Sequence, residues 1–498
     1  MKAALDSWLR AAALGEDQVG AARAAAEAVA GDAWQVVETA GALARSRVET
    51  AAVDVGITER LDHVAVDSPR AVARVGQGAP VPVRDRAGRR RRGAFDTPRA
   101  MARRTVAAGL EAAGGANSAR DPACGAGAFL VALHEAGVRD VYGSDLDPAA
   151  VAVAQVAVPS ASLTVADGLD ARAPVDLVVG NPPFVPPERQ TRALREALSV
   201  RFPWLRGRYD LAVPFAAVCV SQARRGVSLV LPASLMVQPY AAPLRRRWIE
   251  RHRVHMLTAP EPFPGATVYV VTVALEVGAG PAALPSGVTP VELLELVSVP
   301  LTTHHRPGDV AIIRHIRSVS TVLGDHCLVD TGLVAHGPLG GKARLLRDEG
   351  GPHRVKYADA REFFAGGHRW LEWRPEEMHR SKSPSMFERP KIVVQRLRGR
   401  RPIRAQVCRD GIYVGHTCTV VQPSDPSAPL DALAALIRDP LVDAVLRMER
   451  GARLDLYPRD VAAIPVPLSW CESPTRSLAE AWGLTCAQER RLRAWVES

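Results

Sequence analysis

Lysine is scarce in this chain, since only five of its 63 basic residues are lysine. None of the five has an acidic residue two positions before it, so the acid-x-lysine pattern of the common metal-dependent nucleases is missing. None of the seven cysteines forms a Cys-x-x-Cys pair, so neither a disulfide framework nor a zinc site is indicated.

Long apolar segments are missing as well. The apolar runs Leu211–Val220 and Val268–Val277 are shorter than the roughly 20 residues that a membrane span needs. The first residues contain no uninterrupted apolar stretch of the kind found in a signal peptide. We therefore expect a reduced, cytoplasmic protein with no membrane segment and no metal site.

The chain does have length, an ordinary apolar content and an excess of positive charge. Its 498 residues suggest about three domains, and its hydrophobic fraction of 47% is typical of a globular protein. The net charge of +10 favours a polyanionic partner. Because nearly all of this charge is arginine in an alanine-rich chain, coding bias is the alternative explanation.

The composition and the apolar pattern of the sequence change twice along the chain. Residues 1–80 are alanine-rich with apolar positions at helical spacing, which predicts a helical N-terminal domain. Over residues 81–280, short apolar strands alternate with helical stretches, which predicts an α/β domain with a doubly wound, mostly parallel sheet. A segment rich in Gly, Pro and Ala then leads to a mixed α+β region, residues 281–498.

The first informative segment is Asp121–Leu130, which contains Cys124, Gly125 and Gly127. Glycines between a strand and a helix let the backbone approach a ligand closely, and a helix N-terminus presents free N–H groups. A tight turn without a ligand is the alternative for this pattern alone.

Acidic residues end the next two predicted strands. Asp145 is well placed to bind ribose hydroxyls, whereas Asp147 precedes a proline and is expected to cap a helix. Asp167 follows the third strand, where a carboxylate suits an adenine amino group.

The segment Asn181-Pro182-Pro183-Phe184 follows a buried-strand run. Two prolines make the backbone rigid, so the Asn181 side chain and the Pro182 carbonyl become two fixed acceptors beside an aromatic ring. This arrangement suits a flat ligand with an exocyclic NH₂ group, which stacks on Phe184.

Together these segments resemble the gamma class of N6-adenine DNA methyltransferases of restriction–modification systems. Gly93–Pro98 and Pro262–Gly265 also match segments of that class, and the six segments occur in the order of the family between Gly93 and Val277. The C-terminal region resembles a target-recognition domain more loosely, through Phe387–Ile392, Gly411–Tyr413 and Tyr457–Pro467.

The resemblance implies a Rossmann-like methyltransferase sheet that binds S-adenosyl-L-methionine and acts on double-stranded DNA. It implies that Asn181 and Pro182 accept the amino protons of a flipped-out adenine while Phe184 and Phe263 stack on its two faces. The residues that the resemblance implies for the cofactor are Thr97, Asp121, Cys124, Gly125, Gly127, Asp145 and Asp167.

Arginines in the C-terminal region are the expected DNA contacts. Arg396, Arg398, Arg400 and Arg401 are the candidates, with phosphates rather than base edges as their targets. The neighbouring pair His304-His305 is expected in a solvated loop.

Several alternatives remain at this point. The chain could be a modification subunit that needs a separate specificity protein, an N5-glutamine or RNA methyltransferase, or a DNA-binding protein without catalysis. Cytosine N4 is the alternative target atom. Any restriction activity is expected to belong to a separate nuclease or defence-system subunit.

Overall fold

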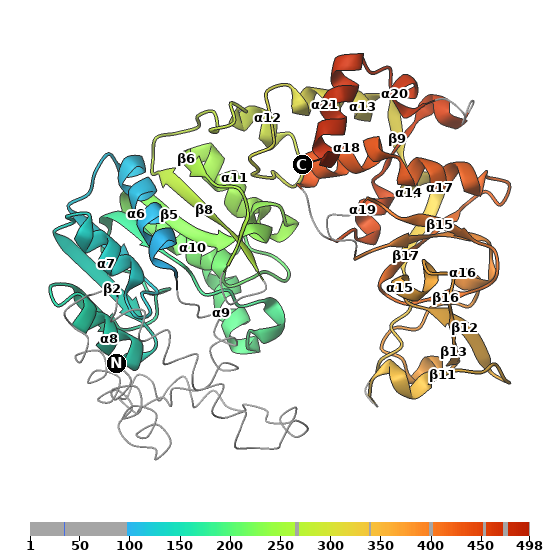
Figure 1. Cartoon of the computed structure of the whole chain (residues 1–498), viewed down its shortest axis with the longest axis horizontal. Helices are drawn as coiled ribbons and strands as arrows, with labels where there is room; N and C mark the ends of the chain where they lie inside the picture. Colours follow the sequence, from blue (N-terminus) through green and yellow to red (C-terminus); the bar gives the residue numbers. More distant parts are fainter. Residues whose placement is uncertain are drawn as a thin grey trace. The chain divides into compact units, whose positions relative to one another are not determined.

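The computed structural model describes Trp34 and residues 97–263, 268–337, 340–397, 402–451, 455–471 and 477–497 (Figure 1). Except for Trp34, the predicted helical region 1–80 lies outside these residues. The chain divides into two compact units. The first unit extends to Val291 and includes Leu301–Thr303, and the second unit comprises Glu292–Pro300 and His304–Ser498. The domain boundaries given above stay predictions.

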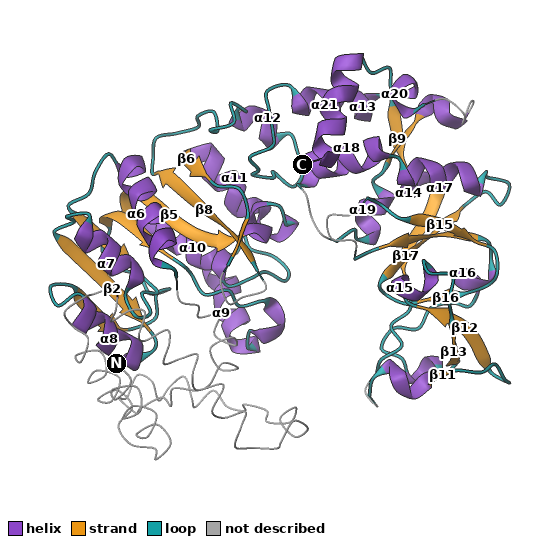
Figure 2. Ribbon diagram, viewed as in Figure 1, coloured by secondary structure: helices purple, strands orange, loops and turns teal. Residues whose placement is uncertain are grey.

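A mostly parallel sheet forms the centre of the first unit (Figure 2). Its strands have the spatial order β3-β2-β1-β4-β5-β8-β6, and β7 pairs with β8. The five strands β3-β2-β1-β4-β5 are parallel to one another, whereas β8 is antiparallel to both β5 and β6. The strands are β1 (Ser118–Asp121), β2 (Asp140–Asp145), β3 (Ser162–Val165), β4 (Val175–Gly180), β5 (Ala223–Pro232), β6 (Arg253–Leu257), β7 (Glu261–Pro262) and β8 (Tyr269–Glu276). The predicted doubly wound α/β sheet is confirmed, and β8 is inserted into the common 3-2-1-4-5-6 order.

Helices pack closely on this sheet. Helix α6 (Arg99–Ala113) packs on β4, β5 and β8, and α10 (Ala212–Ser221) packs on β4 and β5. Gly109 permits the approach of α6, because a Cβ there would lie 2.9 Å from the side chains of both Leu177 and Ser228. The other helices of this unit are α7 (Ala128–Glu135), α8 (Pro148–Ala157), α9 (Arg192–Arg201), α11 (Ala242–Arg251) and the short 3₁₀ turns η1 (Pro187–Arg189), η2 (Ala233–Met236) and η3 (Pro239–Ala241).

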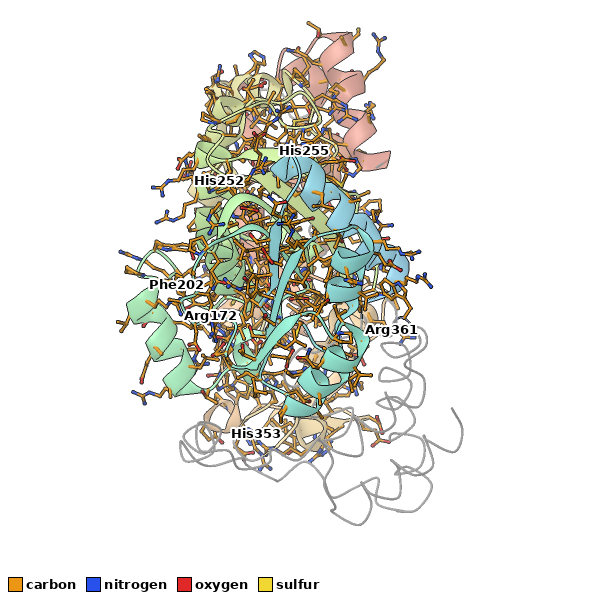
Figure 3. All side chains as sticks on the ribbon, turned by 90° about the vertical axis from the view of Figure 1, so that its left-hand side faces the viewer. Arg172, Phe202, His252, His255, His353 and Arg361 are labelled. Atoms are coloured by element: carbon orange, nitrogen blue, oxygen red, sulfur yellow. The ribbon has the colours of Figure 1, made fainter. Side chains whose placement is uncertain are left out.

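Two histidines lie at the β6 edge of the sheet (Figure 3). The Nδ1 atom of His252 accepts a hydrogen bond from the N–H of Gly278 at 3.0 Å. The Nε2 atom of His255 lies 3.5 Å from the carboxylate of Glu111 in α6. These contacts tie the edge strand to its neighbours in the first unit.

The second unit contains both helices and small sheets. Its sheets have the orders β10-β17-β14-β15, β11-β13-β12-β16 and β18-β9. The strands are β9 (Ser320–Val322), β10 (Cys327–Thr331), β11 (Leu346–Arg347), β12 (Arg354–Ala358), β13 (Arg369–Glu372), β14 (Lys391–Gln395), β15 (Ala405–Cys408), β16 (Tyr413–Val414), β17 (Cys418–Pro423) and β18 (Pro465–Pro467). The helices are α13 (Asp309–Ser318), α14 (Leu323–His326), α15 (Ala360–Phe363), α16 (Ser385–Glu388), α17 (Leu430–Arg438), α18 (Pro440–Arg450), α19 (Pro458–Ala462), α20 (Leu478–Ala481), α21 (Cys486–Glu497) and the turns η4 (Lys342–Leu345), η5 (Pro375–Glu377) and η6 (Leu468–Cys471), while α12 (Pro290–Leu294) spans the division between the units.

The two larger sheets of the second unit share one apolar cluster, which includes stacked aromatic side chains. Phe387 and Tyr413 stack with ring centroids 4.6 Å apart, and Trp373 meets the edge of Tyr413 at 5.0 Å. Phe387 and Leu371 are fully buried in the same apolar cluster. The Phe387–Ile392 segment therefore contributes to a core.

The expectation of a solvated loop is wrong for His305. Its side chain is 1% exposed, and its ring nitrogen Nε2 lies 2.8 Å from the carbonyl oxygen of Met448. Its ring also packs against Trp495 at 4.7 Å. Burial lowers the pKa of His305 to about 4, so the ring is neutral and donates to Met448. Contacts with α18 and α21, far along the chain, decide this placement.

Candidate active site

The carboxyl ends of the parallel strands bring the predicted site segments to one edge of the sheet. Strands β1, β2 and β4 end at Asp121, Asp145 and Gly180. The strand order reverses between β1 and β4. Ligands of doubly wound sheets bind at such a reversal, outside the carboxyl ends of the strands.

The loop after β1 has the conformation that its glycines suggest. Gly125 and Gly127 have φ angles of +51° and +99°, in the left-handed region that favours glycine. Gly127 precedes α7, and a Cβ at this position would lie 3.2 Å from the Cβ of Ala154 in α8. Both the backbone angle and the packing thus favour glycine at residue 127.

Asp145 connects this loop to the end of β2. Its Oδ2 atom accepts a hydrogen bond from the N–H of Gly125, and its Oδ1 atom accepts one from the N–H of Asp147, both at 2.9 Å. The N–H of Cys124 donates to the carbonyl of Ser144, also at 2.9 Å. A carboxylate offers about four acceptor sites in all, which makes Asp145 chemically suited to bind a hydroxyl.

Asp147 has the capping role that the sequence predicts. Its Oδ1 atom accepts a hydrogen bond at 3.0 Å from the N–H of Ala149 in the first turn of α8, and Pro148 is the first helical residue. The two acids near the end of β2 therefore have different local contacts.

The segment after β3 also reaches the β1 loop. A Cβ on Gly168 would overlap the carbonyl oxygen of Pro122 and lie 2.5 Å from the ring of Phe215. Asp167, the preceding residue, accepts a hydrogen bond at 2.9 Å from the N–H of Leu169. The structure thus brings Asp167 close to the loop that contains Cys124 and Gly125.

Asn181 lies directly after β4 and contacts Thr97. Its Nδ2 atom donates to the Thr97 hydroxyl at 3.2 Å, although the residues are 84 positions apart. Within the described part of the chain, the Asn181 Oδ1 atom is buried and accepts no hydrogen bond. Because an unpaired buried acceptor costs free energy, this atom is a candidate for a ligand contact.

Asp121 is the second buried acceptor at this edge. Its Oδ1 atom accepts from the N–H of Ala123 at 3.0 Å, while Oδ2 has no hydrogen-bond partner among the described residues. Burial raises the pKa of Asp121 to about 8, and the nearby charge of Asp145 adds to the shift. Burial also raises the pKa of the Cys124 thiol well above its ordinary value, so this group is no thiolate nucleophile.

The aromatic residues of the predicted site are buried. Phe184 is 8% exposed and Phe263 is 1% exposed. Pro182 is also buried, whereas Pro183 is partly exposed. A base could therefore stack on these rings only after neighbouring side chains move, and the four residues 264–267 lie outside the described part of the chain.

Sequence reasoning missed a support for the loop after Asn181. The carboxylate of Asp210 accepts hydrogen bonds from the N–H groups of Val185 and of Ala212, the latter at 2.9 Å. Gln190 is buried and donates to the carbonyls of Val185 and Tyr209, both at 2.8 Å. Burial raises the pKa of Asp210 to about 6. An aspartate just before the apolar helix α10 was the available signal, since acids often cap such helices.

The predicted DNA contacts lie in the second unit. Arg396 follows β14, its guanidinium lies 4.5 Å from the ring centroid of Tyr457, and Nη1 donates to the carbonyl of His416 at 3.3 Å. Arg398, Arg400 and Arg401 lie outside the described residues. Among the described residues, no group of three or more His, Cys, Asp and Glu could hold a metal ion, and no helix is long and apolar enough to cross a membrane.

Solved structures with a similar fold are known, whereas no similar sequence was found. No protein-family profile matches the chain, and neither does any curated protein sequence. Similar solved structures include the type IIL restriction-modification enzyme MmeI in complex with DNA, at 14% identity over 84% of this chain and 77% of that chain, with a TM-score of 0.51. The chain therefore shares the fold of MmeI over most of its length.

Two further structures resemble smaller parts of the chain. One is a modification subunit assigned to a type I restriction enzyme from Vibrio vulnificus YJ016, at 16% identity over 38% of this chain and 45% of that chain, with a TM-score of 0.29. The other is assigned as a class I S-adenosylmethionine-dependent methyltransferase from Listeria monocytogenes, at 14% identity over 57% of this chain and 90% of that chain, with a TM-score of 0.34.

Proposed function

We propose that this chain is a DNA methyltransferase that transfers a methyl group from S-adenosyl-L-methionine to the N6 atom of a flipped-out adenine in duplex DNA. Asn181 carries the proposal, because its Oδ1 atom, at the carboxyl end of β4, is a buried acceptor that has no hydrogen-bond partner among the described residues. The Thr97 hydroxyl fixes the other end of the same amide. An exocyclic amino group would provide the missing hydrogen bond.

The loops at the same edge fit the cofactor. Gly125, Gly127 and Gly168 have no side chain, so a ligand could approach their backbone closely. Asp145 is fixed by two backbone N–H groups, and its carboxylate is of the kind that binds ribose hydroxyls. The residues that would hold the cofactor are Thr97, Asp121, Cys124, Gly125, Gly127, Asp145 and Asp167. S-adenosyl-L-methionine supplies the methyl group.

Positioning supplies most of the catalysis in this proposal. Asn181 Oδ1 and the Pro182 carbonyl accept hydrogen bonds from the two N–H groups of the amine, which directs the nitrogen lone pair toward the methyl donor. Orientation of this kind contributes up to about 7–11 kcal/mol. Phe184 and Phe263 would stack on the base once it leaves the helix, because N6 cannot be reached inside the stacked duplex.

The partner in this proposal is double-stranded DNA, recognised by the second unit. MmeI, which shares the fold over 84% of this chain, is a restriction-modification enzyme in complex with DNA, and this likeness supports the proposal. The class suggested by the motifs is the gamma class of N6-adenine methyltransferases. Any restriction activity would belong to a separate protein.

The alternatives differ in their acceptors and partners. A modification subunit would methylate DNA only with a specificity protein, and a glutamine or RNA methyltransferase would not methylate DNA. A DNA-binding protein without catalysis would bind no S-adenosyl-L-methionine. Methyl transfer to cytosine N4 would give a different modified base.

A tritium-transfer assay on purified protein tests the proposal. We expect label from methyl-tritiated S-adenosyl-L-methionine to enter duplex DNA of mixed sequence without a second protein. Asn181→Ala should abolish transfer while calorimetry still detects cofactor binding. Asn117→Ala is the matched control, because Asn117 is the only other asparagine and precedes β1 at the opposite edge of the sheet. Retained transfer by Asn181→Ala would contradict the proposed role.

A further inference from the structure

The positive charge of the second unit is concentrated in one stretch of chain. Residues 341–410 contain 18 Lys and Arg against 9 Asp and Glu, a net charge of +9. The whole chain carries +10. If the second unit binds the phosphates of DNA, the contacts are expected to come from this stretch. The contacts of its basic residues then indicate which of them are available to a phosphate.

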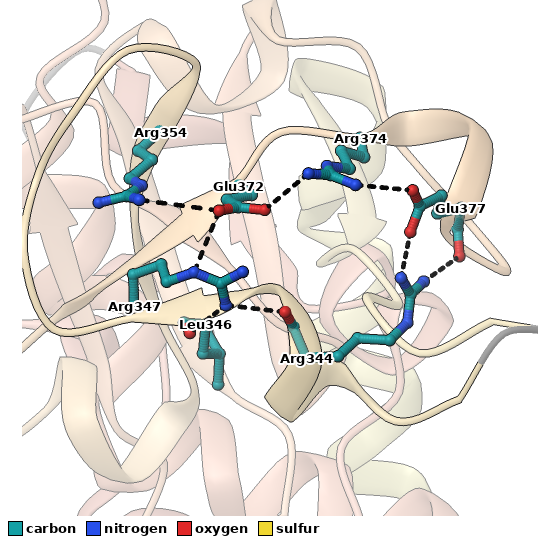
Figure 4. Close-up of polar contacts among 7 residues, drawn as sticks. All are labelled: Arg344, Leu346, Arg347, Arg354, Glu372, Arg374 and Glu377. Atoms are coloured by element: carbon teal, nitrogen blue, oxygen red, sulfur yellow. Dashed lines mark hydrogen bonds and ion pairs between the residues drawn. The ribbon is translucent and has the colours of Figure 1, made fainter.

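Four arginines beside the small sheet β11-β13-β12 are held by carboxylates (Figure 4). Glu372 pairs with Arg347 at 3.0 Å, with Arg374 at 3.1 Å and with Arg354 at 3.7 Å. Glu377 pairs with Arg374 at 3.2 Å and also with Arg344. We call these six residues the carboxylate network. A phosphate would have to compete with the carboxylates for these guanidinium groups.

Other basic residues of the stretch are also engaged. Lys391 is fully buried and donates to the carbonyl of Phe387. Arg404 stacks on the ring of Phe364, at 4.5 Å from its centroid, and donates to the carbonyl of that residue. Ion pairs join Lys342 to Asp359, Arg369 to Glu362, Lys382 to Asp330 and Arg409 to Asp431.

Arg396 differs from these residues because its neighbours are aromatic rings and a carbonyl. It lies against Tyr457 and donates to the carbonyl of His416. His416 meets the ring of His336 at 5.9 Å, and His336 stacks on His379 at 6.3 Å with an interplanar angle of 7°. We call Arg396, His336, His379 and His416 the histidine patch. Three separate segments of the chain thus place imidazole groups together.

The histidine patch is accessible and contains no ion pair. His336 and His379 are exposed, and His416 and Arg396 are partly exposed. No ion pair between described residues joins any of the four to a carboxylate. The charged groups that face His416 are Lys342, which is paired with Asp359, and Arg396.

Electrostatics at the histidine patch favour an anion. The pKa of His416 is lowered, first by its burial and then by the neighbouring His336, Arg396 and Lys342. A phosphate between these groups would reverse the second effect, because a negative charge stabilises protonated imidazole. The sequence continues from Arg396 into Arg398, Arg400 and Arg401, which adds positive charge close to the patch along the chain.

We propose that the histidine patch, and not the carboxylate network, is the surface of the second unit that contacts the phosphate backbone of duplex DNA. This inference rests on the proposed function, and it names the residues through which its DNA substrate is held. Imidazolium and guanidinium groups donate hydrogen bonds to phosphate oxygens. These contacts fix the position of the protein on the duplex but do not read the base sequence.

Salt dependence of DNA binding separates the two surfaces. The probe is a fluorescein-labelled duplex of mixed sequence, bound to the full chain and followed by anisotropy over a range of NaCl concentrations. Arg396→Gln should reduce the slope of log Kd against log salt by about 0.9, the value of one phosphate contact. Arg374→Gln removes the same charge from the carboxylate network and should leave the slope unchanged. Arg396→Lys keeps the positive charge, so the slope should stay at the wild-type value. A reduced slope in this variant as well would indicate that changes at residue 396 disturb the fold.

A second measurement tests the histidines themselves. The double variant H336A/H379A should bind the duplex more weakly than the wild type at low salt, because it loses two imidazole groups that can donate to phosphate oxygens. His326→Ala, which changes an exposed histidine of α14 outside the patch, should bind as tightly as the wild type.

These measurements distinguish failure of the patch from failure of the proposed function. The inference is overturned if Arg374→Gln reduces the slope as much as Arg396→Gln, or if H336A/H379A binds the duplex as tightly as the wild type at low salt. A protein that binds the duplex through the patch but transfers no methyl group would support the inference and contradict the proposed function. A wild-type protein that does not bind the duplex would overturn both.

Discussion

In the first unit, backbone N–H groups bind the acidic side chains at the strand ends, whereas in the second unit guanidinium groups bind the acidic side chains around β13. Asp121, Asp147 and Asp167 each accept a hydrogen bond from the residue two positions further along the chain. Glu377, in contrast, pairs with Arg344, which is 33 positions away. A local partner leaves a pattern in the sequence, and a distant partner does not.

This difference also affects how each unit should respond to its surroundings. The buried carboxyl group of Asp121 responds to pH, since burial dominates its protonation. The partly exposed ion pairs of the carboxylate network respond to salt, because ions screen them.

Gly168→Ala should have the largest effect. Its Cβ would overlap the backbone of Pro122, which is part of the proposed cofactor loop. We expect a loss of about 3 kcal/mol or more in unfolding free energy, together with weaker cofactor binding. Urea unfolding and calorimetry measure the two effects. Gly341→Ala in the second unit is the control, because nothing lies within 4 Å of its Cβ position, and a similar loss there would show that the Gly168 contact is not the cause.

Asp121→Asn should change how stability depends on pH. The folded pKa of Asp121 is raised to about 8, while the unfolded value is about 3.9. Between these values the unfolded chain binds fewer protons, so the stability of the wild type falls as the pH rises. The amide variant lacks this titration and keeps an acceptor for Ala123. Its stability relative to the wild type should therefore increase from about pH 4 to about pH 8, as measured by urea unfolding. A constant difference would show that Asp121 is not buried as a carboxyl group.

Asp210→Ala should affect catalysis more than cofactor binding. The change removes the acceptor that holds the N–H of Val185, directly after the proposed catalytic segment. We expect kcat to fall by about 10–100-fold, because a small misplacement of reacting groups is costly, while the cofactor Kd changes little. Asp210→Asn keeps an oxygen acceptor and should recover part of the loss. Equal values of kcat in the wild type and Asp210→Ala would contradict this positioning role.

Glu372→Gln should have the smallest effect, and one that depends on salt. The variant loses the charge that three arginines share in the carboxylate network. We expect a loss of about 1 kcal/mol or less at low salt, which shrinks as NaCl is added. Urea unfolding at low and high NaCl measures it, with Asp167→Asn as the comparison, since its local partner is a backbone N–H. If the loss in unfolding free energy for Glu372→Gln did not depend on salt, the proposed difference between ion pairs in the second unit and N–H contacts in the first would be wrong.

The sheet and the strand-end motifs could be predicted because their determinants are local. The apolar run before Asn181 forms β4, and Asp147 caps α8 as its Pro148 neighbour suggests. The insertion of β8 between β5 and β6 could not be predicted, since it depends on pairing between distant strands.

Features that depend on tertiary contacts could not be predicted from the sequence. The burial of His305 depends on Met448 and Trp495, and the hydrogen bond between Thr97 and Asn181 depends on how α6 packs on the sheet. The sequence shows where the arginines occur, but it does not show which of them form ion pairs with carboxylates. The contrast between Arg396 and the carboxylate network therefore required the structure.

The identity of the modified base decides whether this chain methylates the N6 atom of adenine. The chain and its Asn181→Ala variant would be expressed in a host without adenine methylation, and the nucleosides of the host DNA analysed by mass spectrometry. Our account predicts N6-methyladenine with the wild type and none with Asn181→Ala. Unmodified DNA, N4-methylcytosine, or N6-methyladenine at the same level with the variant would contradict it.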